Sequence, residues 1–386
     1  MNPHQRRAVR NGVIGVVLTA ALLFAIDAAV STHPRSERTS PTPSPSATPA
    51  TCEPDVSVVR SQSPDATGDQ LLGVAAVARD DAWAVGGAGD PAAPVSTLIE
   101  RWDGSRWNVV ASPDGAQAVN VLQAVDAGTH NDAWAVGRAS DGSIDRALIE
   151  HWDGTAWTPA TSPTVTASAQ LLGVAAVSRK DAWVVGSTGD PAAGMERALL
   201  LHWDGSSWTP VDVTGAVGGG RSLLAGVSAA SETDVWAVGY RHDLPLVLHF
   251  DGRRWTSPRV ASGGELAAVV AVSATDVWAV GASILHYDGT AWTEDGRVRR
   301  GGPLTGVAAA GPNDVWAVGS GAETGRAVVR RWNGKVWDII ATEDRAEVLT
   351  AASALPDETV WAVGYRETPR GRRTLVLEGR ACAAGA

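Results

Sequence analysis

Four histidines in this chain hold one recurring position, and imidazole nitrogens are common zinc ligands. Each directly precedes an aromatic residue, and they are His151, His202, His249 and His286. Arg101 and Arg331 hold the same position elsewhere in the chain. A zinc site needs several ligands that converge on one point, whereas a position that recurs along a repeat is spread over the fold. We therefore predict a structural role for these side chains, with no metal site and no cofactor.

Asp-Gly pairs could supply carboxylates to calcium, and they recur at Asp103, Asp153, Asp204, Asp251 and Asp288. Calcium takes about six to eight oxygen ligands, so single carboxylates on separate turns do not build a site. Tight β-hairpins favour Asp-Gly for its turn chemistry. The stretch 215–222 resembles a phosphate-binding loop with Arg in place of Lys, but the strand-like run 223–227 follows where that motif needs a helix. We therefore predict no catalytic residue.

These residues all belong to one repeat. Its signature, Asp-Ala/Val-Trp-Ala/Val-Val-Gly, occurs six times, and a seventh copy at 359–364 lacks only the Asp. The central tryptophans are Trp83, Trp134, Trp183, Trp236, Trp278, Trp316 and Trp361. Their spacing of 38 to 53 residues is typical of an array of similar structural units.

Each unit has the pattern of four short β-strands. In the unit at 171–210, apolar runs alternate with polar or Asp-Gly turns, as in a strand meander. The first run of each unit is rich in Gly, Ala and Val, which suits innermost strands crowded around one axis. All 17 Trp fall on second, third or fourth strands, where diverging units leave space for large side chains. The sequence therefore predicts an all-β, seven-bladed β-propeller.

The seventh unit has no fourth strand of its own after 374–377. The stretch 56–64 resembles the fourth strand at 107–113, so we predict that this N-terminal strand completes the last blade and closes the ring. Cys52 and Cys382 are the only cysteines, and they bracket the repeats. An even cysteine count in an exported chain predicts a disulfide between them.

The residues before the propeller have three different compositions. Residues 1–11 are basic, and 12–30 form an apolar stretch interrupted only by Asp27 near its far end. This stretch is either an uncleaved single-pass anchor, which its length favours, or a signal peptide that is removed. Residues 31–51 are rich in Pro, Ser and Thr and predict a disordered linker. The propeller at 52–386 would then lie outside the cytoplasm, held at the cell membrane through the N-terminal helix only, or be secreted.

The charge of the chain argues against one class of partner. The net charge is -10, although the N-terminal segment is basic, so the repeat region is more acidic than the whole chain. An acidic body repels phosphate backbones, and we expect no nucleic-acid partner.

The run from Asp276 to Gly281, followed by Tyr287-Asp288-Gly289 and Trp292, resembles the repeats of tectonin-type propellers and of bacterial kelch-like and Asp-box propellers. The resemblance covers 56–380. It implies a propeller fold and, because tectonin-type proteins often recognise glycans or lipopolysaccharide, it suggests a glycan ligand. The units here are longer than tectonin repeats, and the Asp-Gly turn is one residue shorter than an Asp box.

The variable loops of such a fold share one face, and function tends to lie on loops held by a rigid scaffold. Arginines gather there at 297–300 and 366–373, whereas aspartates mark blades one to three. Two Tyr-Arg pairs directly follow the repeat Gly at this face, and their tyrosines are the only repeat aromatics away from packing positions. The candidate ligand-binding residues are Tyr240, Arg241, Tyr365, Arg366 and Arg370. A solvated rim is the alternative interpretation.

We expect a monomeric, non-catalytic binding or scaffolding module whose partner is a protein or a cell-envelope glycan. One alternative is a lectin-like propeller that stacks a sugar ring on Tyr240 or Tyr365. A second alternative is a carbohydrate-active enzyme, a glycosidase or lyase. A glycosidase would need two carboxylates about 5 to 10 Å apart, and we expect them in the central channel if they exist.

Overall fold

The computed structural model describes residues 55–62, 64, 68–90, 94–115, 117–163, 168–190, 193–260, 263–295, 302–321, 325–340, 347–357 and 359–380. The chain divides into two compact units, Met1–Thr51 and Cys52–Ala386. The first unit, which carries the predicted membrane or signal helix and the linker, lies outside the described residues, and so do Cys52 and Cys382. Among the described residues, no helix has the length and apolar character needed to cross a membrane.

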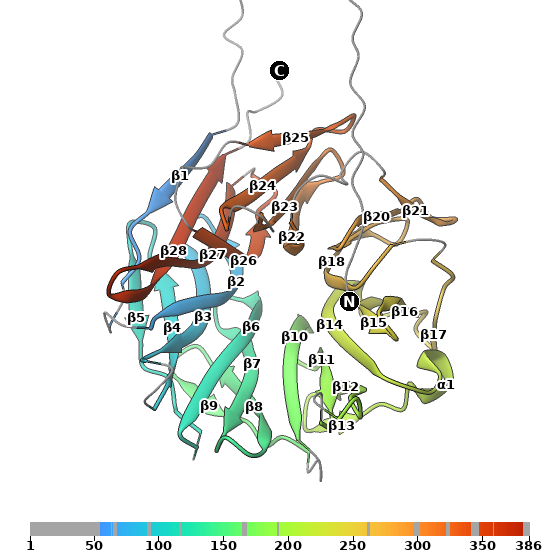
Figure 1. The fold of residues 1–386 in the computed structure, drawn as a ribbon, viewed down its shortest axis with the longest axis horizontal. Helices are drawn as coiled ribbons and strands as arrows, with labels where there is room; N and C mark the ends of the chain where they lie inside the picture. Colours follow the sequence, from blue (N-terminus) through green and yellow to red (C-terminus); the bar gives the residue numbers. More distant parts are fainter. Residues whose placement is uncertain are drawn as a thin grey trace, which may run out of the picture. The chain divides into compact units, whose positions relative to one another are not determined.

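Seven antiparallel sheets of four strands each make up the described part of the second unit and surround a central space (Figure 1). The prediction of a seven-bladed, all-β propeller is confirmed. One helical turn in the described residues, α1 (Thr214–Val217), was not predicted from the sequence. It precedes the glycines of the loop at 218–220, and a strand follows them, so the helix that a phosphate-binding loop requires is not there.

The strands follow one another in each blade from the innermost to the outermost. Blade 1 contains β2 (Gln70–Ala78), β3 (Asp81–Ala88), β4 (Ser96–Trp102) and β5 (Trp107–Val110). Blade 2 contains β6 (Val119–Thr129), β7 (Asp132–Ser140), β8 (Asp145–Trp152) and β9 (Trp157–Pro159). Blade 3 contains β10 (Ala169–Ser178), β11 (Asp181–Thr188), β12 (Arg197–Trp203) and β13 (Trp208–Pro210). Blade 4 contains β14 (Ser222–Ser231), β15 (Asp234–Arg241), β16 (Leu244–Phe250) and β17 (Trp255–Thr256).

The remaining blades follow the same order, except at the end of the chain. Blade 5 contains β18 (Leu266–Ser273), β19 (Asp276–Gly281), β20 (Ile284–Tyr287) and β21 (Trp292–Glu294). Blade 6 contains β22 (Leu304–Gly311), β23 (Asp314–Ser320), β24 (Ala327–Trp332) and β25 (Trp337–Ile340). Blade 7 contains β26 (Glu347–Ala354), β27 (Thr359–Thr368) and β28 (Gly371–Arg380), with β1 (Asp55–Val59) as its outermost strand.

The strand β1 pairs antiparallel with β28, from Asp55 opposite Arg380 to Val59 opposite Val376. In Figure 1 the blue β1 accordingly lies beside the red β28. The first and last described strands of the chain thus share one sheet. This sheet therefore joins segments more than 300 residues apart without a connecting turn.

The glycine that ends each repeat signature has a steric reason. In blade 1, a Cβ on Gly86 would lie 1.9 Å from the carbonyl oxygen of Gln70 on the innermost strand, and the equivalent clash recurs in the other blades. The register of the first two strands shifts beside this point, between Leu71 and Gly73. Only glycine allows the two backbones to approach so closely at this bulge.

The tryptophans hold neighbouring blades together. Trp83 of blade 1 is fully buried, and its ring centroid lies 4.9 Å from that of Trp152 and 5.2 Å from that of Trp157 in blade 2. The same group of three forms between blades 7 and 1, where Trp361 contacts Trp102 at 5.0 Å and Trp107 at 5.2 Å. Burying large rings at each junction stabilises the stack of blades, because apolar area removed from water is the main favourable contribution to folding.

A four-stranded meander gives the propeller two different faces. We call the face with the turns between strands one and two and between strands three and four the short-turn face. The opposite face, with the connections between strands two and three and between blades, is the long-loop face. The candidate residues from the sequence lie at the long-loop ends of β15 and β27.

Candidate functional site

The recurring histidines and arginines lie near the short-turn face, each paired with the aspartate that opens the second strand of its own blade. His151 Nε2 lies 2.7 Å from Asp132 Oδ1, and Arg331 donates from Nε to Asp314 at 2.7 Å. The equivalent pairs are His202–Asp181, His249–Asp234, His286–Asp276 and Arg101–Asp81. Each histidine also packs on the tryptophan of its own blade, with ring centroids 4.0 to 4.2 Å apart.

This arrangement distributes one acid–base pair to each of six blades. In the described part of the chain, no three His, Cys, Asp or Glu side chains gather where they could hold a metal ion. The Asp-Gly carboxylates are likewise engaged within their own turns. Asp153 Oδ1 accepts hydrogen bonds from the Thr155 hydroxyl and from the backbone N–H groups of Thr155 and Ala156, which lower the pKa of Asp153 to about 2.

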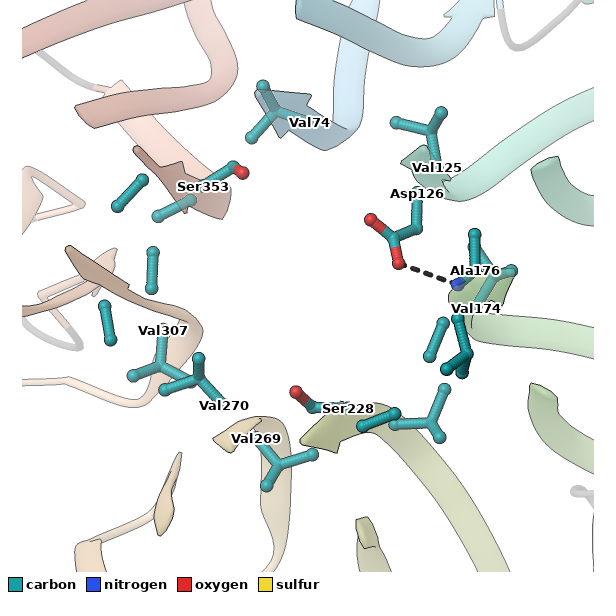
Figure 2. Close-up of a pocket in the computed structure, with 18 residues that line it drawn as sticks. Val74, Val125, Asp126, Val174, Ala176, Ser228, Val269, Val270, Val307 and Ser353 are labelled. Carbon is teal, nitrogen blue, oxygen red and sulfur yellow. Dashed lines mark hydrogen bonds between the residues drawn. The ribbon is translucent and has the colours of Figure 1, made fainter. Parts of the chain in front are cut away.

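The side chains that line the central channel are mostly small and apolar (Figure 2). A cavity of about 260 Å3 lies toward the short-turn end of the channel, and a second cavity of about 170 Å3 lies next to it. The boundary between the two is lined by Val74, Val125, Val174 and the equivalent residues of the other blades. Among the described residues, Asp126 is the one carboxylate that lines either cavity. It accepts from the backbone N–H of Ala176 in the next blade at 2.8 Å, and burial raises its pKa. The pair of carboxylates that a glycosidase needs is not in this lining.

Tyr240, at the end of β15, lies in a closed network between blades 3 and 4. Its side chain is buried, with 8% of the residue exposed, and its hydroxyl donates to Glu196 and accepts from Arg221 at 3.0 Å. Burial, with the contact to Glu196, raises the pKa of Tyr240 to about 12. The guanidinium of Arg221 lies over one ring face at 4.9 Å and also pairs with Asp243 at 3.0 Å. This tyrosine is therefore not an exposed platform for a sugar, as the lectin hypothesis requires.

Arg241 follows Tyr240 and points elsewhere. Its side chain is exposed, and it donates from Nη1 to the Val217 carbonyl at the end of α1 at 2.8 Å. The network of blades 3 and 4 thus contains as many carboxylates as arginines, and both carboxylates, Glu196 and Asp243, form ion pairs with Arg221.

Tyr365 holds the same position in blade 7, but its surroundings are basic. The guanidinium of Arg372 covers one face of its half-buried ring at 4.4 Å, and Arg372 also donates to Glu367 at 2.9 Å. Arg370 is exposed at the tip of the β27–β28 hairpin. Arg366 is mostly buried and lies 3.7 Å from Glu347, which is itself 1% exposed.

A cleft of about 770 Å3 lies between blades 7 and 1 beside this hairpin. We call it the basic cleft, and Arg60, Arg366 and Arg373 supply the charges of its lining. Val58, Val59 and Val109 give it an apolar side, and Ser61, Gln62 and Thr374 add neutral polar groups. The structure therefore brings Arg366, a residue predicted from the sequence, together with Arg60 and Arg373, whereas Tyr240 and Arg241 lie in the separate network of blades 3 and 4.

The sequence reading did not select Arg60 or Arg373 as site residues. Arg60 belongs to an N-terminal segment whose place beside blade 7 depends on a long-range strand pairing.

The predictions from sequence also missed two buried glutamates, Glu100 and Glu150, at a third-strand position where four other blades have leucine. Burial raises the pKa of Glu100 to about 7 and that of Glu150 to about 8, although Ser61 and Ser112 donate to them. An acid directly after an apolar Leu-Ile pair, at a position where other blades have leucine, was the signal available for these two.

Comparison with known proteins identifies the fold and no family. No family model matches the chain, and no curated protein matches it. Among solved structures, it is similar to YCF48 bound to D1 peptide, with 14% identity over 85% of this chain and 97% of that one and a TM-score of 0.56. The WD40 repeats of RRP9 match at 12% identity over 85% and 98%, with a TM-score of 0.59. The WD40 propeller domain of Doa1 matches at 10% identity over 85% and 96%, with a TM-score of 0.57. At these identities the likeness establishes the β-propeller fold alone.

Proposed function

We propose that this protein is a non-catalytic binding or scaffolding module that recognises a protein partner through its long-loop face. The observation that carries the proposal is the basic cleft, where three arginines and an apolar wall meet between rigid blades. Its volume of about 770 Å3 lies within the range of roughly 300 to 1,000 Å3 that is usual for ligand sites. A rigid scaffold that presents such a cleft can bind without a large ordering cost.

Two further observations support a protein partner over a glycan or an enzymatic substrate. The two tyrosines that could stack a sugar ring each have an arginine over one face. In the described part of the channel lining, Asp126 is the single acid, whereas hydrolysis of a glycosidic bond would need a pair. One of the similar structures is a complex with a peptide, which is a property of that protein and a precedent for this fold. The likeness to tectonin-type repeats keeps a glycan as the competing ligand.

We further propose that the propeller works outside the cytoplasm as a monomer. The basic residues 1–11 and the apolar stretch 12–30 support either a single-pass anchor or a cleaved signal peptide. The Pro, Ser and Thr content of 31–51 suits a spacer between a membrane and the propeller.

Cross-linking of the full chain in intact cells, followed by mass spectrometry, tests the proposed function. We expect cross-links between one or a few proteins and residues of the long-loop face, and fewer cross-links when unlabelled propeller is added as competitor. Protein cross-links confined to the short-turn face, or binding to a glycan array with no protein cross-link, would refute it.

A further inference from the structure

The basic cleft and its surroundings carry more arginines than acidic residues. Around it, the hairpin from Arg366 to Arg373, the start of β26, Arg60 and the buried Glu100, which accepts from the cleft residue Ser61, together carry five arginines and three glutamates. Glu367 pairs with Arg372 on the outer part of the hairpin, and Glu347 forms an ion pair with Arg366 at 3.7 Å. Burial raises the pKa of Glu100 to about 7, so this carboxyl is only partly ionised at neutral pH. Within the described residues, the cleft therefore has more positive charge than its neighbours neutralise.

Two of the cleft arginines lie directly opposite each other on neighbouring strands. Arg366 of β27 is the register partner of Arg373 of β28. Side chains at such positions have Cβ atoms about 5 Å apart, and like charges there are destabilising. An anion held between the two guanidinium groups would convert this repulsion into attraction.

The hydrogen-bonding capacity of Arg366 is also incompletely used. Its Nε is buried and has no hydrogen-bond partner among the described residues. Leaving a buried charged donor unpaired costs free energy. A carboxylate fits this arrangement because a guanidinium can bind its two oxygens with two parallel N–H groups.

The shape and the apolar lining of the cleft indicate what carries the carboxylate. Val58 and Val109 are among the few large apolar side chains of the described surface that are exposed, at 45% and 42%. They come from β1 and β5, the outermost strands of two neighbouring blades. An outermost strand has backbone groups without a partner on one side, and an extended peptide can pair with them. All seven blades have such an outermost strand, but the one at the basic cleft also lies beside three arginines.

We propose that the basic cleft binds an acidic segment of a partner protein, with carboxylates on Arg60, Arg366 and Arg373 and an aliphatic side chain against Val58 and Val109. This inference rests on the proposed function and specifies the chemistry of the partner. The bound segment is extended, and its acidic residues alternate with aliphatic ones so that the two kinds of side chain reach opposite walls.

The test is a titration of the purified full chain with a fluorescein-labelled peptide of alternating Glu and Val, followed by anisotropy. A peptide of alternating Gln and Val is the uncharged control, and a heparin oligosaccharide is the alternative anion. We expect the Glu peptide to bind and the Gln peptide to bind about tenfold more weakly or worse. Equal binding of the two peptides, or binding of heparin without binding of the Glu peptide, would overturn the proposal.

Matched variants locate the site on the protein. Arg366→Gln and Arg373→Gln are each expected to weaken the Glu peptide by about tenfold, and the double variant by more. Arg370→Gln, at the exposed tip of the same hairpin, and Arg241→Gln, at the position of Arg366 in blade 4, should change affinity by less than about twofold. Loss of binding in the two control variants to the same extent as in the cleft variants would show non-specific attraction and contradict the assignment.

The same variants separate failure of this site from failure of the proposed function. If the cross-linked partner of the wild-type chain remains cross-linked to Arg366→Gln/Arg373→Gln at an unchanged yield, the acidic-peptide site is wrong and the binding module stands. If no protein is cross-linked to the wild-type chain, the proposed function itself is wrong, whatever the peptide does.

Discussion

Blades 4 and 7 carry the same Tyr-Arg pair at the same position, and the two pairs have opposite surroundings. Beside Tyr240, Glu196 and Asp243 equal the arginines in number, and both form ion pairs with Arg221. Beside Tyr365, Gly325 occupies the position of Glu196, and arginines outnumber acids. A residue motif therefore does not define a site, because the charges contributed by neighbouring blades decide whether it is neutralised or left to attract a ligand.

The two regions also differ in how the chain connects them. Blades 3 and 4 are joined by a continuous chain through α1, whereas blades 7 and 1 meet through the pairing of β1 with β28. Ser61, just after β1, connects both sides of that junction, since it contacts Glu100 of blade 1 and Thr374 of blade 7. The proposed ligand site thus lies at the junction that depends on long-range strand pairing.

Deletion of 52–65 tests this difference most severely. We expect the melting temperature to fall by about 10 °C or more, because β28 loses one of its two partner strands and Glu100 loses Ser61. Deletion of 31–50 is the matched control and should leave the melting temperature unchanged. Calorimetry of both deletions provides the measurement, and equal melting temperatures would show that β1 does not hold the ring closed.

Replacement of Glu100 makes the interior of the blade 7–1 junction resemble that of blade 4, where Leu248 has the same position. The carboxyl has a folded-state pKa of about 7 against an ordinary value of 4.5, so the folded state binds more protons between these values. The contribution of this carboxyl to stability is therefore greatest below about pH 4.5 and falls as the pH rises toward 7. Glu100→Leu should remove this part of the pH dependence, while the part from Glu150 remains, and stabilise the protein at pH 8 by about 3 kcal/mol at most.

Urea titrations at pH 5 and pH 8 measure this effect, and Leu248→Glu is the reciprocal control. The control should destabilise the protein, and more strongly at pH 8 than at pH 5, because it buries a carboxyl without a serine partner. A Glu100→Leu variant that is less stable than the wild type at pH 8 would contradict the argument.

Removal of Glu196 makes the blade 3–4 network resemble the basic cleft. Glu196→Gln should destabilise the fold by about 2 kcal/mol, because Tyr240 and Arg221 lose a buried anionic partner. Chemical denaturation measures the loss, with Asp243→Asn as the control for an exposed partner of Arg221, where we expect less than about 1 kcal/mol. Similar losses in both variants would mean that burial of Glu196 is unimportant.

The smallest predicted effect concerns the arginine that covers Tyr365. Arg372→Gln should cost about 0.5 to 1 kcal/mol through loss of the contact between the guanidinium and the ring. It should also make the fluorescence of Tyr365 easier to quench with a neutral quencher, because the ring becomes more accessible, whereas Arg370→Gln should not change the quenching. An unchanged quenching profile in Arg372→Gln would show that the guanidinium does not shield the ring.

The number of blades and strands could be predicted from the sequence because the same pattern occurs seven times along the chain. Trp83 and its equivalents mark the second strand of each blade. Repetition also assigned the four histidines to separate blades, where their aspartate partners are found. The two Tyr-Arg pairs could not be told apart, because Glu196 and Gly325 lie on loops whose lengths vary between blades. Arg60 belongs to the predicted closing strand at 56–64, but the sequence did not fix the register of that strand on β28, which is what brings Arg60 to the same cleft as Arg366.

The sharing of blade 7 between the two ends of the chain has a consequence for the order of synthesis. The ribosome makes β1 before any other strand of the propeller and β28 after all of them. The earliest strand must therefore wait, with its edge open, until translation has delivered every other blade. A circularly permuted gene that moves 55–62 behind 380 would end that delay and make the last sheet from consecutive segments.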